Sequence, residues 1–323
     1  MGRFVNSGNS AFQVALNSEI YVDKTGLLAY TNKVMDTTAK FICNSRPRRF
    51  GKSITADMLT AYYCKGCSSE EMFSSLEIGQ APGFTKYLNQ YDVIYLDITL
   101  FLSTLKQSDM LVAQIEQEII DDLAQSYPEI AVEHRLVDSL CKMNQITGRK
   151  LILIIDEWDA MFRECKGADE ILDNYILLLR SLFKSSLTDQ LFAGVYMTGI
   201  LPIKKYGHES AVSDFYEYSM VEPRPLQEYI GFTTEEVKSL CQKYDKDYTI
   251  MQEWYDGYTV GGVHVYNPKS VMESILRDKY SSYWTKTETY EALRNYIDMN
   301  FDGLKDTVVD MLGGEKCEVD TGS

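Results

Sequence analysis

The residues best placed to do chemistry form the segment SRPRRFGKS, residues 45–53, which directly follows a short apolar run. Its last residues, Gly51-Lys52-Ser53, are those of a phosphate-binding loop: backbone N–H groups surround a phosphate, the lysine neutralises its oxygens and the hydroxyl ligates Mg²⁺. The pattern G-x-x-x-x-G-K-[ST] fails only at Arg46, where the first glycine would stand. That glycine contributes backbone conformation and no side-chain contact, so its loss need not abolish phosphate binding. The alternative is a solvated basic turn.

A second candidate group lies at the end of the apolar run Leu151–Glu157. An acidic residue at the carboxyl end of a parallel strand lies at the ligand-binding edge of an α/β sheet. There Asp156 would hold Mg²⁺ through water, and Glu157 would orient and deprotonate an attacking water. Thr198, near the end of the apolar run Phe192–Gly199, would touch the γ-phosphate or its water. The alternatives are two charges where a strand turns into solvent, and a strand-capping threonine.

The order of the expected elements places these groups together. Apolar runs alternate with segments of helical periodicity, and several runs are apolar throughout, which is typical of a parallel sheet covered on both faces. We expect strands at 39–45, 92–98, 150–155, 192–199 and, more weakly, 216–221, and helices from 52 to about 65, 108 to about 143 and 169–187. After residue 222 the character changes to a helical stretch and then to turns and short strands. A domain boundary near 222 follows from this change.

The composition narrows the classes of partner that we expect the protein to bind. The chain has 323 residues, 45 % of them apolar, and a net charge of −15, which opposes non-specific binding to nucleic acid or anionic membranes. No apolar run is long enough to span a bilayer and no signal core begins the chain, so we expect a cytoplasmic protein with reduced thiols. The seven cysteines include one CxxC pair, Cys64 and Cys67. A zinc site would need a second pair of ligands, so a loop with two incidental cysteines is the preferred interpretation.

Six motifs occur in one order along the chain: YVDKT at 21–25, SRPRRFGKS at 45–53, IIDEWD at 154–159, TGIL at 198–201, WYDGY at 254–258 and VYNP at 265–268. As a set they resemble the motifs of the bacterial AAA-ATPase-like proteins, and the resemblance runs from about residue 5 to the end of the chain. The loop of that family is usually written R-P-R-R-F-G-K-[ST], so Arg46 is the form that the family uses.

The resemblance implies an α/β fold of the P-loop NTPase class, in the ASCE division, with a helix-covered parallel sheet of order 5-1-4-3-2 over residues 1–222. A smaller, mostly helical or winged-helix-like region would follow over 223–323. Longer members resemble fusions to a nuclease-like domain of the PD-(D/E)xK type. The chain is then either truncated before such a domain or an ATPase module without it.

The candidate site follows from the residue chemistry and the resemblance together. Catalysis is assigned to Glu157 and Thr198, and the metal to Ser53 and Asp156. Nucleotide binding is assigned to the whole loop, namely Arg46, Pro47, Arg48, Arg49, Phe50, Gly51, Lys52 and Ser53. Arg48 and Arg49 are expected to reach phosphates or a partner subunit.

The expected function is Mg²⁺-dependent ATP binding and hydrolysis by a nucleotide-driven switch. One alternative is a slow or non-hydrolysing ATP-binding module that regulates a protein partner, which the acidic composition favours. Another is the ATPase part of a nuclease-linked nucleic-acid enzyme. Beyond ATP and Mg²⁺, the expected partners are a protein or further copies of the chain, with no membrane and no nucleic acid for this module alone.

Overall fold

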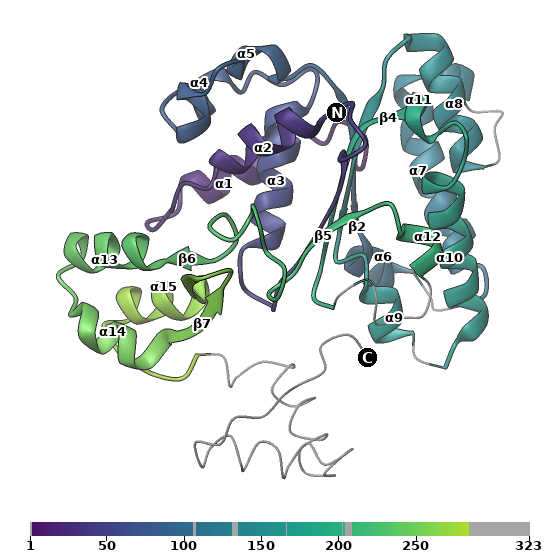
Figure 1. Cartoon of the computed structure of the whole chain (residues 1–323). Helices are drawn as coiled ribbons and strands as arrows, with labels where there is room; N and C mark the ends of the chain where they lie inside the picture. The colour runs from purple at the N-terminus through teal and green to yellow at the C-terminus, as the bar shows by residue number, and fades with distance from the viewer. Residues whose placement is uncertain are drawn as a thin grey trace. The chain divides into compact units, whose positions relative to one another are not determined.

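The computed structural model describes residues 2–105, 108–130, 135–165, 167–201, 203 and 209–283. These residues form two compact units (Figure 1). The first runs to Ile230 and includes Val260–Val263, and the second comprises the remaining described residues from Gly231 onward. The first unit therefore extends past the boundary predicted near residue 222. The predicted C-terminal region continues over 284–323, which lies outside the described residues.

A five-stranded parallel sheet organises the first unit. Its strands are β1 Phe41–Ser45, β2 Asp92–Asp97, β3 Leu151–Asp156, β4 Phe192–Gly199 and β5 Tyr216–Tyr218. They lie in the order β2-β3-β4-β1-β5, which read from the β5 edge is the predicted 5-1-4-3-2. The sheet is irregular in two places. β5 has only three residues, and the β3–β4 register shifts between Leu151 and Ile152.

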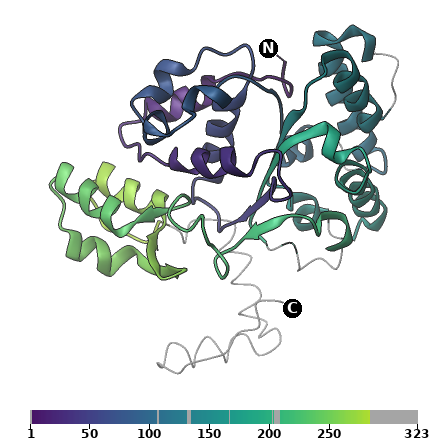
Figure 2. The ribbon, with the colours of Figure 1, turned by 45° about the horizontal axis from the view of Figure 1, so that its top comes forward.

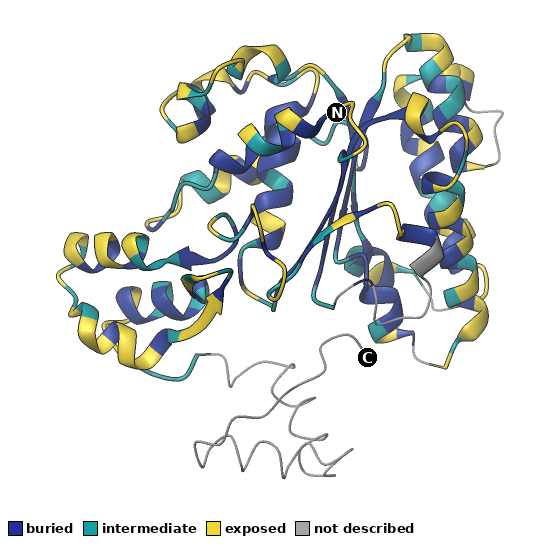
Figure 3. Ribbon diagram, viewed as in Figure 1, coloured by how far each residue is buried: buried dark blue, intermediate teal, exposed yellow. Residues whose placement is uncertain are grey.

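The strands are apolar because both faces of the sheet are covered. Every residue of β1, β3 and β4 is buried (Figure 3). Continuous burial of this kind is what an apolar run without alternation predicts. The sheet edge at which the strands end, in contrast, carries the polar residues Ser45, Asp97 and Asp156.

Helices cover the two faces in separate groups (Figures 1 and 2). One face packs against α1 Ser10–Leu16, α2 Gly26–Val34, α3 Lys52–Tyr63, α4 Glu70–Ser74, the 3₁₀ turn Glu77–Gln80 and α5 Phe84–Tyr87. The other packs against α6 Ile98–Thr104, α7 Leu111–Ser126, the 3₁₀ turn Pro128–Ile130, α8 Leu136–Thr147, α9 Ala160–Glu164, α10 Asp169–Phe183, α11 Thr188–Leu191 and α12 Glu209–Val212. The predicted helical stretch from 108 to about 143 is thus two helices, α7 and α8.

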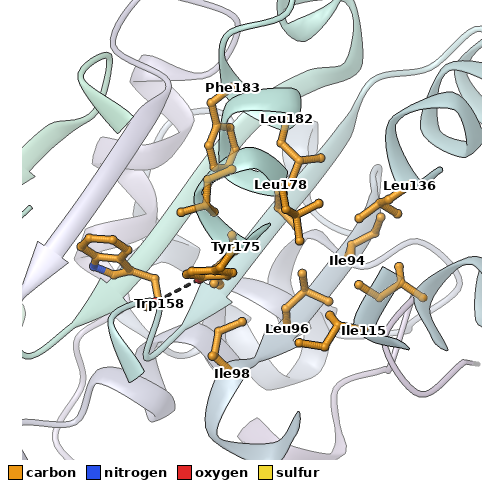
Figure 4. Packing of buried hydrophobic residues seen from close by; sticks show 14 of the residues in the cluster. Ile94, Leu96, Ile98, Ile115, Leu136, Trp158, Tyr175, Leu178, Leu182 and Phe183 are labelled. Carbon is orange, nitrogen blue, oxygen red and sulfur yellow. Dashed lines mark hydrogen bonds between the residues drawn. The ribbon is translucent and has the colours of Figure 1, made fainter. Parts of the chain in front are cut away.

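The core between the sheet and the second group of helices, α6 to α12, carries one contact that matters for the site. In Figure 4, Tyr175 of α10 points toward Trp158, which lies in the turn after β3. The Tyr175 hydroxyl donates a hydrogen bond of 2.9 Å to the Trp158 carbonyl oxygen. Both side chains are almost fully buried, so α10 fixes the turn that follows β3.

The second unit combines three helices with a small sheet. Its elements are β6 Phe232–Thr233, α13 Thr234–Lys243, α14 Tyr248–Tyr255, β7 Asp256–Val260, β8 Val263–Tyr266 and α15 Pro268–Leu276, with the sheet order β6-β8-β7. Thr233 caps α13 through a reciprocal pair of hydrogen bonds with Glu236. The helical stretch expected after residue 222 includes α13, which begins at Thr234. None of the described helices in either unit has the length and apolar character needed to cross a bilayer.

Candidate nucleotide-binding site

The loop between β1 and α3 has the backbone of a phosphate cradle. Gly51 is the residue before the helix and adopts a left-handed conformation, φ 88°. Only glycine takes this conformation without strain, which explains Gly51 in physical terms. The Gly51 carbonyl accepts from the Thr55 N–H at 3.0 Å, so α3 starts at once with Lys52. The first N–H groups of the helix therefore face the loop, where an anion would be stabilised.

Lys52 brings the two sequence motifs together. Its side chain is almost fully buried, and its Nζ lies 3.3 Å from Glu157 Oε1. The same Nζ donates to the Pro47 carbonyl oxygen at 3.3 Å. The predicted phosphate-binding lysine and the predicted catalytic glutamate are thus an ion pair across the sheet edge.

Asp156 ends β3 beside that pair and is 2 % exposed. Its carboxylate accepts a hydrogen bond from the Thr198 hydroxyl, the Tyr95 hydroxyl lies 3.4 Å from Oδ2, and the Ser53 hydroxyl lies close enough to act on its pKa. Burial raises the pKa of Asp156, and the hydroxyls of Ser53 and Thr198 act in the opposite direction. Ser53 of α3, Asp156 of β3 and Thr198 of β4 were all predicted as site residues, and they lie together here.

Glu157 follows in a left-handed conformation, φ 53°, which is uncommon for a residue with a side chain. Its N–H donates to Thr198 Oγ1 at 3.2 Å. Its Oε2 accepts from Arg163 NH2 at 2.5 Å. The two carboxylate oxygens of Glu157 are therefore held by two different cations, Lys52 and Arg163.

Asp159 connects the turn after β3 to the turn after β4. The carboxylate is fully buried, accepts the N–H groups of Ile200 and Leu201 at 3.2 and 3.0 Å, and lies 3.2 Å from Arg163 Nε. Burial raises the pKa of Asp159, while Arg163 and the two N–H groups act to lower it. At Gly199, a Cβ would lie 2.7 Å from Trp158 Nε1 and 3.0 Å from Asp159 Oδ1. The glycine of the TGIL motif is thus required by this close approach.

Arg46 occupies the position of the missing glycine and is 1 % exposed. Its NH1 donates to the carbonyl oxygens of Ser45 at 3.0 Å and Tyr218 at 2.7 Å, and its main-chain N–H donates to Gly199 at 3.0 Å. Arg46 therefore joins the start of the loop to β1, β4 and β5. Burial lowers the pKa of Arg46 to about 10, which still leaves it charged at neutral pH. Its assignment to nucleotide binding stays a prediction.

The other loop residues differ in exposure. Phe50 is buried, Pro47 and Arg48 are half-buried and Arg49 is exposed. Arg49 has φ 71°, so the backbone turns into the left-handed region twice within the loop, at Arg49 and at Gly51. Ser53 is exposed at the start of α3, with its hydroxyl near the Asp156 carboxylate.

Four further residues of this region were missed from sequence: Tyr95, Asp57, Asp159 and Arg163. Asp159 and Arg163 stand four residues apart, the spacing of neighbours on a helix face, and this was the available signal. Asp57 lies one helical turn after Ser53. Burial, together with the charges of Asp156 and Asp97, raises its pKa to about 6.

The donor set here fits Mg²⁺. This ion takes hard oxygen ligands and keeps several waters, so a hydroxyl and one carboxylate are a sufficient protein contribution beside phosphates. Ser53 and Asp156, which lie near each other, would supply that pair. Among the described residues, no group of three or more His, Cys, Asp or Glu side chains has the geometry of a metal site.

Comparisons with known proteins give a partial match to a curated relative. An uncharacterized protein in the vnfD 5′ region of Azotobacter chroococcum mcd 1 is 24 % identical over 279 residues. The aligned part covers 83 % of this chain and 51 % of the relative, so the chain spans about half the length of the relative that it matches.

Solved structures give distant similarities. AMPPCP-bound DnaA from Aquifex aeolicus aligns with a TM-score of 0.35 and 9 % identity, covering 86 % of this chain and 68 % of that one. The Aeropyrum pernix ORC2 protein, in ADPNP–ADP complexes, aligns with a TM-score of 0.37 and 14 % identity, covering 70 % and 53 %.

The family comparison is decisive because it covers more than half of the chain. The model described as "Predicted AAA-ATPase" matches residues 8–208, which include the loop, Asp156, Glu157 and Thr198. The chain belongs to the family of predicted AAA-ATPases.

Proposed function

We propose that this chain binds ATP with Mg²⁺ at the carboxyl edge of its sheet and hydrolyses it, as a nucleotide-driven switch. The observation that carries the proposal is the ion pair of Lys52 with Glu157 at 3.3 Å, beside the buried Asp156 carboxylate and its hydrogen bond from Thr198. A lysine at a helix start, a hydroxyl, a buried aspartate and a neighbouring glutamate are the parts that phosphoryl transfer to water requires.

Each side chain then has a role. Lys52 and the first N–H groups of α3 bind the phosphate oxygens. Ser53 and Asp156 hold Mg²⁺, which when bound neutralises phosphate charge. Glu157 orients the attacking water and accepts its proton. Thr198 positions Asp156 and the Glu157 N–H, and we propose that it contacts the γ-phosphate or its water.

The pairing of Glu157 with Lys52 supports a switch. Phosphates compete with Glu157 for Lys52, because both are anions that pair with the same ammonium group. ATP binding is then expected to free Glu157 Oε1, so hydrolysis begins only after the nucleotide has bound. The left-handed backbone of Glu157 makes this turn a strained element of the site.

The test is calorimetric titration with Mg²⁺–ATP beside a phosphate-release assay. Lys52→Ala is expected to abolish ATP binding, while Lys33→Ala, an exposed lysine of α2, serves as the matched control. Glu157→Gln is expected to keep binding and lose hydrolysis, with exposed Glu164→Gln as its control. Unchanged phosphate release in Glu157→Gln would remove that residue as the base.

A second candidate is an ATP-binding regulator with slow turnover that acts on a protein partner or on further copies of the chain. The net charge of −15 favours it, because an acidic surface disfavours nucleic acid. A complex that forms only with ATP, in a protein whose turnover is near background, would support this alternative. DNA-stimulated hydrolysis at physiological salt would instead support the nuclease-linked alternative.

We propose a cytoplasmic location because the described cysteines are free thiols.

A further inference from the structure

The carboxylate of Glu157 pairs with two cations, Lys52 and Arg163. The phosphates of ATP would compete for Lys52 but not for Arg163. Oε1 pairs with Lys52 at 3.3 Å, and Oε2 pairs with Arg163 at 2.5 Å. Lys52 lies at the first position of α3, where phosphates are expected. Arg163 belongs to α9, which begins at Ala160, shortly after Glu157 in the chain. A nucleotide that draws Lys52 away therefore leaves Arg163 as the cation that holds this carboxylate.

Arg163 is itself fixed in place. Its side chain is 14 % exposed, and its Nε lies 3.2 Å from the fully buried carboxylate of Asp159. Asp159 in turn accepts the N–H groups of Ile200 and Leu201, directly after β4. The guanidinium thus rests on a carboxylate that is anchored to a second strand end. The contact of Nε with Asp159 is an ion pair and not a hydrogen bond, so the directional contact of the guanidinium is its hydrogen bond to Glu157 Oε2.

We propose that Arg163 is a positioning residue that holds Glu157 through Oε2 so that Oε1, once released by Lys52, faces the attacking water. This inference rests on the proposed hydrolysis of ATP. Arg163 contacts neither phosphate nor water in this account. It acts through Glu157, and its own support is Asp159.

The geometry makes a quantitative expectation. Loss of the guanidinium frees the Glu157 carboxylate to rotate, and a misplacement of about 1 Å costs on the order of 100-fold in rate. We therefore expect Arg163→Met to lower kcat for phosphate release about 10- to 100-fold. The KM for ATP and the calorimetric Kd are expected to stay within about threefold, because the phosphate contacts are untouched.

The experiment measures phosphate release and ATP binding for the parent, Arg163→Met, Arg163→Lys, Glu157→Gln and the double variant Arg163→Met/Glu157→Gln. Arg135→Met is the matched control, since that arginine is 68 % exposed and pairs only loosely with Asp138 at 4.0 Å. Arg163→Lys is expected to recover part of kcat. Because Arg163 acts through Glu157, the double variant is expected to be no slower than Glu157→Gln alone.

The outcomes separate the inference from the function that it rests on. Parent-like kcat in Arg163→Met, or a double variant slower than Glu157→Gln by the full factor of Arg163→Met, overturns the inference while hydrolysis stands. A matching loss of ATP affinity and kcat overturns it as well, because that is the mark of a structural role. A parent that releases no phosphate overturns the proposed hydrolysis itself, and the role of Arg163 in it as well.

Discussion

Replacing Arg46 by glycine restores the full pattern G-x-x-x-x-G-K-[ST], yet we expect this change to weaken the protein and its nucleotide site. The reason is that the guanidinium carries contacts that glycine cannot supply. Its NH1 donates to Ser45 at 3.0 Å and to Tyr218 at 2.7 Å, so it ties the start of the loop to the edge strand β5. That strand has only three residues, and the bond from Arg46 adds to its pairing with β1 and to the Ser45–Glu217 hydrogen bond.

The magnitude follows from those contacts. Two hydrogen bonds from a charged donor contribute about 1.5–3 kcal/mol each, or about 3–6 kcal/mol in all. Arg46 NH2 is buried without a hydrogen-bond partner, and its removal returns about 1–3 kcal/mol. The added freedom of glycine in the unfolded chain costs about 0.5–1 kcal/mol. The net loss is about 3 kcal/mol, equivalent to a fall in Tm of roughly 6–12 °C for a unit of this size.

The assay is differential scanning calorimetry without nucleotide, followed by titration with Mg²⁺–ATP. Arg46→Met serves as the companion variant, because it loses the same hydrogen bonds but keeps an apolar stem and adds no glycine. We expect Arg46→Gly to bind ATP at least about tenfold more weakly than the parent, which corresponds to about 1.4 kcal/mol. An Arg46→Gly variant with the parent Tm and equal or tighter ATP binding would refute the reasoning, since the glycine would then be the better residue at this position.

Three further predictions concern single residues. Gly51→Ala places a Cβ in a left-handed backbone, so we expect a loss of about 1–2 kcal/mol in thermal unfolding and a parallel loss of ATP binding. Gly199→Ala brings a Cβ to 2.7 Å from Trp158, so Tm should fall and the near-ultraviolet dichroism of that indole should change. Asp57 has a pKa raised to about 6 from its ordinary 3.8, mainly by burial and then by Asp156. A raised carboxyl pKa means that ionisation of Asp57 costs folding free energy; this cost grows as pH rises from 3.8 to about 6 and is fully present above that range. Asp57→Asn should therefore add about 1–2 kcal/mol at pH 7.5 and little near pH 4; an equal gain at both pH values would contradict this assignment.

The sequence was sufficient to predict the sheet and to place Asp156 and Thr198 at the edge where its strands end. Runs such as Leu151–Asp156 are buried on both faces and therefore lack alternation, which identifies parallel strands. Because parallel strands end at one edge, Asp156 and Thr198 had to lie near the loop that follows β1. The strand order came from the family resemblance, since periodicity alone does not rank neighbours.

The contacts between distant side chains were beyond the sequence. Arg46 reaches the main-chain carbonyl of Tyr218, and any residue at that position supplies such an acceptor. No residue type therefore signals the contact. Arg163 was missed for a related reason: an arginine in a short helix is most often solvated, and its pairing with Glu157 depends on the left-handed turn of that glutamate. Position 199 requires glycine because a Cβ there would lie 2.7 Å from Trp158 Nε1, a contact that the sequence does not reveal.

The measurement that tests the central claim most directly is Mg²⁺–ATP titration of the parent, Lys52→Ala and Lys33→Ala, with phosphate release measured on the same samples. The account predicts binding in the parent and in Lys33→Ala, no binding in Lys52→Ala, and phosphate release only where ATP binds. ATP binding that survives in Lys52→Ala, or its absence from the parent, would contradict the assignment of this loop as the nucleotide site.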